Sequence, residues 1–214
     1  MPPAIALKNR PKGRPRKEHS ANIRQQIMDT AVDLFARQGY AATSVREIAE
    51  QVDVNPAMVH YYFGNKDALL HAALEQLLEP LAKAIATMKK SSEAPLQQMV
   101  SLMLAAFSAK PSLPVLMTRE ALLPGGVVQQ YFMETFAPRL GGALPEILRG
   151  EQQSGRIRAD LDPRIVTQML LGLCAFPFIS QSMAGPVLGV SYDANGFAEL
   201  ERHIIELLEK GLLS

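Results

Sequence analysis

The N-terminal segment of the chain carries a high density of positive side chains. Six Lys or Arg residues lie within ten positions, and no Asp or Glu lies among them: Lys8, Arg10, Lys12, Arg14, Arg16 and Lys17. Like charges at this density repel one another, so this arm is not expected to pack against a folded domain. Residues 1–66 hold 10 Lys or Arg and 6 Asp or Glu, a net charge of +4, whereas the remainder holds 12 and 15, a net charge of −3. The basic part of the chain is therefore its N-terminal part, which suits a polyanionic partner.

Residue patterns that would support catalysis are absent from the sequence. No nucleophile and base lie at a matching spacing, and Gly125-Gly126 and Gly141-Gly142 lack the neighbours of a phosphate-binding loop. His60 has no other His, Cys or acidic cluster at metal-ligand spacing. The lone Cys174 lies in an apolar run without a nearby charge, which favours a buried, inert thiol over a redox sensor. We therefore expect no enzyme, no cofactor and no metal.

Apolar residues recur at helical spacing along the chain, and no strand-like alternation persists for more than a few residues. The fold is therefore predicted to be all-α, with about nine helices. Three short helices are expected at 20–39, 44–51 and 56–63, followed by about six longer ones. This pattern divides the chain into a basic flexible arm at 1–19, a small helical module at 20–66 and a larger helical body at 67–214.

The two short helices at 44–51 and 56–63 have clear start signals. Ser44 with Glu47 three residues later is a capping box, and Asn55 precedes Pro56 at a first helical position. Two short helices joined by a brief turn, with a supporting helix before them, are the layout of a helix-turn-helix that reads DNA. The free start of the second helix also offers N–H groups to phosphates.

Over about 50 residues this region resembles the TetR-type transcriptional regulators. Three stretches carry the resemblance: Gly39-Tyr40, Thr43-Ser44-Val45-Arg46-Glu47-Ile48-Ala49, and Val54-Asn55-Pro56-Ala57-Met58-Val59-His60-Tyr61-Tyr62-Phe63-Gly64-Asn65-Lys66-Asp67-Ala68-Leu69. The resemblance implies a dimeric, ligand-responsive DNA-binding regulator, most simply a repressor, whose partners are double-stranded DNA, a small-molecule effector and a second copy of the chain. It also implies a pseudo-palindromic operator.

Carried over by resemblance, residues of the two short helices and their flanks contact bases or phosphates. The set is Thr43, Ser44, Arg46, Asn55, Pro56, Ala57, Met58, His60, Tyr61 and Lys66. Tyr62 and Phe63 are expected to be core residues. In the arm, Gly13-Arg14-Pro15-Arg16 resembles an AT-hook, in which Arg14 and Arg16 enter a narrow minor groove. The alternative is a solvated tail that only raises non-specific affinity.

The body is expected to hold the subunit contact and an apolar effector pocket. We predict the dimer contact on the last two long helices, at 163–182 and 193–210, through Gly172, Ala175, Phe197, Leu200, Ile204 and Leu208. The predicted pocket is rich in thioethers and aromatic rings, which suit an adaptable cavity: Met99, Met103, Phe107, Met117, Phe132, Phe136 and Phe176. Arg119, beside Glu120, is a candidate for orienting a polar end of the ligand, or else part of an ion pair on the helix surface.

The remaining expectations concern location and the competing interpretation. Residues 1–7 are too short for the apolar core of a signal peptide, so secretion is not expected. The charge-free run 165–192 is interrupted by Pro177 and Pro186, so a buried or subunit-contacting helix is expected rather than a membrane span. The sequence therefore predicts a cytoplasmic protein that does not contact a membrane. The alternative to the DNA-binding regulator is an all-helical adaptor whose regulator is a protein partner.

Overall fold

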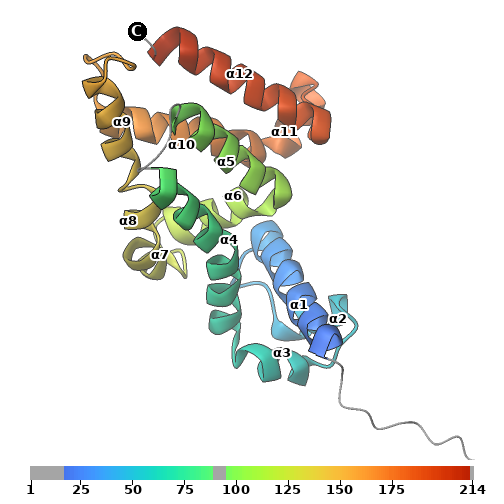
Figure 1. The fold of residues 1–214 in the computed structure, drawn as a ribbon. Coiled ribbons are helices and arrows are strands. Elements are labelled where there is room, and N and C mark those ends of the chain that lie inside the picture. Colours follow the sequence, from blue (N-terminus) through green and yellow to red (C-terminus); the bar gives the residue numbers. More distant parts are fainter. Residues whose placement is uncertain (1–16, 89–94, 213–214) are drawn as a thin grey trace, which may run out of the picture.

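The structure is a computed structural model, in which residues 17–88 and 95–212 are described. All regular elements in these two ranges are helices (Figure 1). Their order is α1 (Lys17–Gln38), α2 (Val45–Gln51), α3 (Pro56–Phe63), α4 (Lys66–Met88), α5 (Pro95–Ala109), α6 (Ser112–Met117), the π-helical segment η1 (Thr118–Leu122), α7 (Gln129–Thr135), α8 (Ala137–Leu140), α9 (Leu144–Gln153), α10 (Pro163–Ile179), α11 (Gln181–Leu188) and α12 (Ala194–Leu212). The all-α prediction is confirmed.

Helices α1 to α3 form a small module at one end of the molecule, far from α11 and α12 (Figure 1). Its centre is made by fully buried apolar side chains, among them Ile27 and Phe35 of α1 and Ile48 of α2. Val59 and Phe63 add the inner face of α3, so the predicted core role of Phe63 is confirmed. Burying these side chains joins the three helices into one module, because α2 with 7 residues and α3 with 8 residues are too short to be stable alone.

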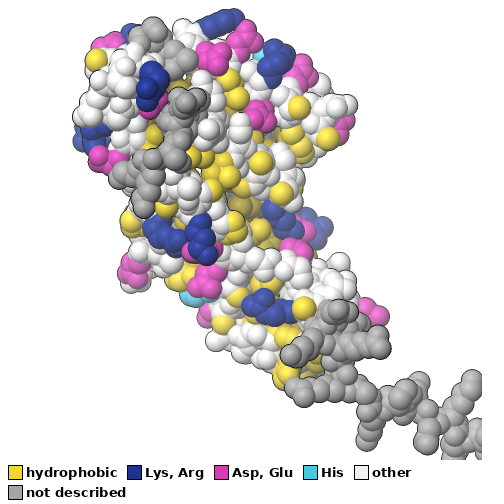
Figure 2. All heavy atoms as spheres, in the orientation of Figure 1, with side chains coloured by type: hydrophobic (Ala, Val, Ile, Leu, Met, Phe, Trp, Pro, Cys, Tyr) yellow, Lys and Arg dark blue, Asp and Glu magenta, His cyan; other side chains and the backbone are white. Residues whose placement is uncertain are grey.

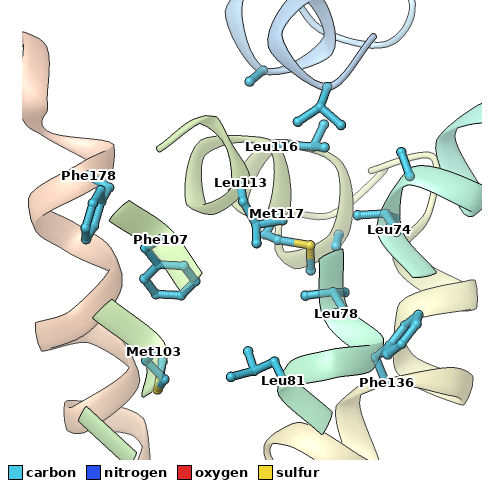
Figure 3. Packing of buried hydrophobic residues seen from close by; sticks show 14 of the residues in the cluster. Leu74, Leu78, Leu81, Met103, Phe107, Leu113, Leu116, Met117, Phe136 and Phe178 are labelled. Carbon is cyan, nitrogen blue, oxygen red and sulfur yellow. The ribbon is translucent and has the colours of Figure 1, made fainter. Parts of the chain in front are cut away.

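Helix α4 belongs to both parts of the molecule. Its first turns bury Leu69 and Leu70 against the module, and its later turns direct Leu78 and Leu81 into the body (Figure 3). The expected boundary at residue 66 therefore falls at the start of one continuous helix. Helix α4 thus connects the two parts without a loop, and Pro80 lies within it.

The core of the body lies where α4, α5, α6 and α10 meet. Met103 and Phe107 of α5, Met117 of α6 and Phe178 of α10 point toward one another and toward the α4 leucines (Figure 3). The rings of Phe107 and Phe178 pack edge to face at 5.6 Å. These contacts fix the body around the same apolar side chains whose pattern predicted its helices.

The structure has more helices than the nine that were expected. Residues 112–122 form the short α6 and the π-helical η1 in direct succession, and a further short helix, α11, follows α10. Helix α11 includes Gly185 and Pro186, which have low helix propensity, so the sequence pattern does not predict this helix.

Among the described helices, no single one is both long and apolar enough to cross a membrane. Two strongly bent pairs reach the length and composition together: Leu96–Ala109 with Ser112–Leu122, and Pro163–Ile179 with Gln181–Leu188. Within the same residues, no group of three or more His, Cys, Asp or Glu side chains could hold a metal ion.

Candidate nucleic-acid interface

The start of α2 is fixed by side-chain caps. The Ser44 hydroxyl accepts a hydrogen bond from the Glu47 backbone N–H at 3.1 Å, as the capping box predicts. The Glu47 carboxylate accepts a hydrogen bond from the Gln38 side chain at 2.9 Å, which ties the cap to the end of α1. Ser44 itself is exposed, so α2 presents a fixed, solvent-facing first turn.

Thr43 is buried in the structure, although the resemblance implies that it contacts DNA. Its side chain is only 1% exposed, and its hydroxyl donates to the Gly39 carbonyl at 2.8 Å. A buried hydroxyl in this position cannot reach a phosphate without opening the turn between α1 and α2. We therefore correct the assignment of the Thr43 side chain from a DNA contact to a support of the turn.

Helix α3 begins where the sequence places it and presents one face to solvent. The Asn55 side chain accepts from the Ala57 N–H at 2.8 Å, and Pro56 occupies the first turn. Ala57 and His60 are exposed, Met58 is half-buried, and Tyr61 is 77% exposed. An aromatic ring left this far out of the core has a free face and a free hydroxyl for a partner.

His60 lies at the end of the exposed face of α3. Its Nδ1 is 2.9 Å from the carbonyl oxygen of Gly64, at the residue where α3 ends with a positive φ of 81°. This bond orients the ring and directs Nε2 away from the helix end. His60 is thus arranged as a hydrogen-bonding group for an external partner.

Arg46 extends from α2 with its side chain 81% exposed. Its Nε lies 2.7 Å from the Glu50 carboxylate, and the carboxylate raises the pKa of the guanidinium. An exposed pair of this kind contributes little to stability, so Arg46 can exchange Glu50 for a phosphate at small cost.

Lys66 is engaged within the protein rather than free. Its ammonium donates to the carbonyls of Tyr40 and Thr43, each at 2.9 Å, and lies 4.0 Å from the centre of the Tyr40 ring. The Tyr40 hydroxyl bonds Asp67. An ammonium group has three donors, so one donor remains for a phosphate, but the other two hold the turn that precedes α2.

Two residues that support α3 are not among the site residues that the sequence predicts. Arg24 of α1 lies over the Phe63 ring at 4.9 Å, and Ser20 shares a 2.8 Å hydrogen bond with the hydroxyl of Tyr62. Both contacts hold the inner face of α3 against α1. No local sequence pattern predicts these two contacts, because the partners are about 40 residues apart. The predicted arm residues Arg14 and Arg16 lie outside the described residues.

On the face that Figure 2 shows, charged side chains form small separate groups, with Lys and Arg mostly beside Asp or Glu. Among the described residues, this face therefore carries no single continuous patch of Lys and Arg.

In the body, five of the predicted effector residues are buried together. They are Met99, Met103, Phe107, Met117 and Phe136, and Phe132 is half-buried beside them. Phe176 is separate from this cluster, because its side chain is 61% exposed on α10. Arg119 is also separate, since it lies against the end of α1 rather than facing the apolar interior.

Two hollows open from the body surface. One, of about 580 Å³, lies between α1, α4 and the α7–α8 segment, and combines Phe136 and Ala72 with the charged groups of Arg24, Glu75, Glu79 and Lys83. The other, of about 520 Å³, lies between α5 and α12, and its lining includes four alanines, Phe197 and the charged Glu201. Glu75 in the lining of the first hollow accepts a hydrogen bond from the Tyr131 hydroxyl at 2.8 Å. Burial raises the pKa of Tyr131 to about 12, so this bond persists at neutral pH.

The predicted dimer residues are divided between core and surface. Ile204 and Leu208 are buried against the body, and Phe197 stacks on Phe178 at 5.4 Å, so these α12 side chains already have partners within the chain. Leu200 and Ala175 are half-buried, whereas Gly172 is exposed. An apolar stripe remains exposed on α10 and α11: Ile165, Met169, Leu173, Phe176, Ile179, Met183, Val187 and Leu188.

Comparison with protein families gives two matches along the chain. A model described as "Bacterial regulatory proteins, tetR family" matches residues 27–73, and one described as "Tetracyclin repressor-like, C-terminal domain" matches residues 93–208. Among curated relatives, the HTH-type transcriptional regulator BetI of Brucella suis is 31% identical over 86 residues. That match covers 40% of this chain and 43% of the relative, so the chain spans less than half the length of this relative.

Solved structures extend the likeness to the whole fold. The transcriptional regulator FadR from Bacillus subtilis, in complex with stearoyl-CoA, has a TM-score of 0.66 and 24% identity, over 87% of this chain and 98% of that chain. The ketosteroid transcriptional regulator KstR2 of Mycobacterium tuberculosis has a TM-score of 0.69 and 18% identity, over 89% and 95%. At these identities the likeness shows a shared fold.

Proposed function

The chain belongs to the tetR family of bacterial regulatory proteins, and we propose that it is a repressor that binds a pseudo-palindromic operator as a homodimer. The observation that carries this proposal is the exposed face of α3. Its start is fixed by the Asn55 cap, its inner side is buried through Val59 and Phe63, and its outer side offers His60 and Tyr61. A short, rigid helix of this kind fits the major groove.

We assign different roles to the residues around this face. Ala57 and Met58 read base edges by apolar contact, whereas Ser44, Arg46, His60 and Tyr61 contact phosphates and set the register. Asn55 and Pro56 present the start of α3 to the backbone of the duplex. Lys66 uses its remaining donor for a phosphate. In this scheme residues 20–66 bind DNA, residues 67–214 carry the effector and the dimer contact, and the protein acts in the cytoplasm.

The test is a selection from random duplex DNA, followed by a titration of the enriched sequence. The expected result is a two-fold symmetric site whose half-sites are separated by whole helical turns of about 34 Å. Affinity should fall steeply with salt because phosphate contacts release counterions. Equal binding to the enriched and random sequences would contradict the proposal and favour the adaptor interpretation.

The exposed stripe on α10 and α11 supports the homodimer. It runs along α10 through Ile165, Met169, Leu173 and Phe176, at spacings of three and four residues, and continues on α11. A continuous apolar face of this size is unusual for a monomer and typical of a subunit contact. Gly172 in this stripe allows close approach of a second helix. We therefore move the proposed contact from the buried α12 residues to this face.

For the effector, we propose a small apolar or amphipathic molecule that enters the cluster of Met103, Phe107, Met117 and Phe136. Two solved structures of similar fold are complexes with small molecules: FadR from Bacillus subtilis with stearoyl-CoA, and a transcriptional regulator from Saccharomonospora viridis with choline. The hollow that reaches Phe136 is mixed in character, so a polar group could remain among Glu75, Glu79 and Arg24. The test is a thermal shift with a panel of fatty acids, acyl-CoA esters and quaternary amines, with Phe136→Ala as the variant that should lose the response.

A further inference from the structure

Arg119 and Glu120, two adjacent residues of the body, both bond the segment that leads into the helix-turn-helix. The Arg119 guanidinium donates to the carbonyls of Arg37 and Gln38, each at 3.2 Å, and to that of Ala36 at 3.4 Å. These are carbonyls of the last turn of α1, which carries a negative partial charge. Arg119 thus caps α1 from a position more than 80 residues away in the sequence.

Glu120 holds the next residues of the same segment. Its carboxylate accepts from the Tyr40 backbone N–H at 2.9 Å, and its side chain is buried. Between the two contacts lies Gly39, with a φ of +93°. A Cβ at Gly39 would lie 3.1 to 3.3 Å from the Arg119 guanidinium, so the glycine lets Arg119 lie flat against the turn.

The same turn is held from its other side by α4. Lys66 bonds the carbonyls of Tyr40 and Thr43, and Asp67 bonds the Tyr40 hydroxyl. The turn before α2 is therefore clamped between the start of α4 and the π-helical η1. π-Helical segments are rare and frequently occur at functional sites.

The body side of η1 is in contact with the region where we propose that the effector binds. Met117 of the buried cluster directly precedes η1, and the Glu120 carbonyl accepts from the Val128 N–H at 3.0 Å, just before α7 with its half-buried Phe132. Gly126 packs so closely that an added Cβ would lie 2.3 Å from the Glu120 carbonyl oxygen. A shift in α7 must therefore move η1.

We propose that Arg119 and Glu120 are positioning residues that fix the helix-turn-helix module in the orientation that reads the operator, and that η1 carries changes in the body to it. This inference rests on the proposed function. It assigns to Arg119 a role in regulation instead of a contact with the effector. The coupling is physical because one short segment touches both parts.

The test compares variants of the full chain. Arg119→Met keeps the aliphatic stem and removes the donors, and Arg139→Met is the control, since Arg139 pairs with Glu79 within the body. Glu120→Ala removes the acceptor that Glu120→Gln retains. In Arg119→Met and Glu120→Ala, we expect the Tyr40 amide to exchange its hydrogen about tenfold faster and the enriched operator to bind about tenfold more weakly. Random duplex should bind within about twofold of the parent.

Gly126→Ala should produce the same two effects from the body side, because its nearest neighbours are backbone atoms of Glu120. Glu120→Gln and Arg139→Met should behave like the parent chain. Parental exchange at Tyr40, or faster exchange with an unchanged ratio of operator to random binding, would overturn the inference. If the parent itself does not distinguish operator from random duplex, the proposed function fails, while the exchange measurement still decides whether the clamp exists.

Discussion

Charging the exposed stripe on α10 should separate the subunits while leaving the fold intact. The perturbation is Met169→Glu with Phe176→Glu, two side chains seven residues apart on one helical face, 63% and 61% exposed in the single chain. Because these side chains already face water, their replacement leaves no cavity in the core of the protomer. The change therefore tests association separately from folding.

The magnitude follows from the exposed fractions. Full burial of a Met or Phe side chain contributes about 1.5 to 3 kcal/mol, so covering the exposed part contributes about 1 to 2 kcal/mol. Each of the two residues occurs twice in a two-fold symmetric dimer, so their burial contributes about 4 to 8 kcal/mol to the free energy of dimerisation as an upper bound. Even half of that range weakens dimerisation by about thirtyfold to a thousandfold. The four introduced carboxylates add a repulsion that salt reduces.

Sedimentation equilibrium at micromolar concentration measures the effect, and circular dichroism checks that helicity is retained. Met133→Glu is the matched control, since Met133 is 57% exposed on α7, away from the stripe. We expect dimers for the parent and the control, and helical monomers for the double variant. Leu200→Glu with Ile204→Glu should instead lose helicity, because Ile204 is only 4% exposed. A dimer that survives the α10 substitutions would refute this interface.

Further predictions concern the cap of α2, the reading of bases by α3, the reactivity of the Cys174 thiol and the stability of the fold in acid. Ser44→Ala removes the α2 cap, which should lower stability by about 1 kcal/mol and Tm by about 2 to 4 °C in a thermal melt. Substitutions at Met58 should redistribute base preference in a repeated selection, whereas Arg46→Ala should weaken all sequences alike and reduce the salt slope. Burial raises the pKa of Cys174 to about 12, so iodoacetamide at pH 8 should label it only after denaturation; rapid labelling of the folded chain would contradict its burial. The Asp162 pKa is held at about 2 by Arg164, so the stabilisation from this cap should be present above about pH 4 and be lost as the pH falls toward 2, and Asp162→Ala should remove that part of the pH dependence.

The local elements of the module could be predicted because their signals are local. Asn55 and Pro56 lie next to each other at the start of α3, and Ser44 lies three residues from Glu47; the structure contains both caps. The same is true of Asp162 and Pro163 at the start of α10. A cap needs only a few neighbouring residues, so one stretch of sequence contains the whole interaction.

The contacts of the body could not be predicted from these patterns. Helical periodicity places Ile204 and Met169 on apolar faces, but it does not say whether a face meets its own chain or a second copy. The structure buries Ile204 and leaves Met169 in water. The sequence makes Arg119 a candidate for a ligand contact or a surface ion pair and predicts neither of its partners at the end of α1, because they lie more than 80 residues away and no spacing rule connects them.

The contacts of η1 with the turn before α2 matter because the proposed subunit contact lies far from α3. The module lies at the opposite end of the molecule from α11 and α12, and α4 connects it to the body through 23 residues, a length of about 35 Å (Figure 1). A rotation of about 5° at the body end of such a helix moves the other end by about 3 Å, close to the rise of one base pair of about 3.4 Å. A dimer held together at its far end can therefore keep two recognition helices in register only if the module cannot rotate on α4. The bonds of Arg119, Glu120 and Lys66 to the turn before α2 oppose that rotation.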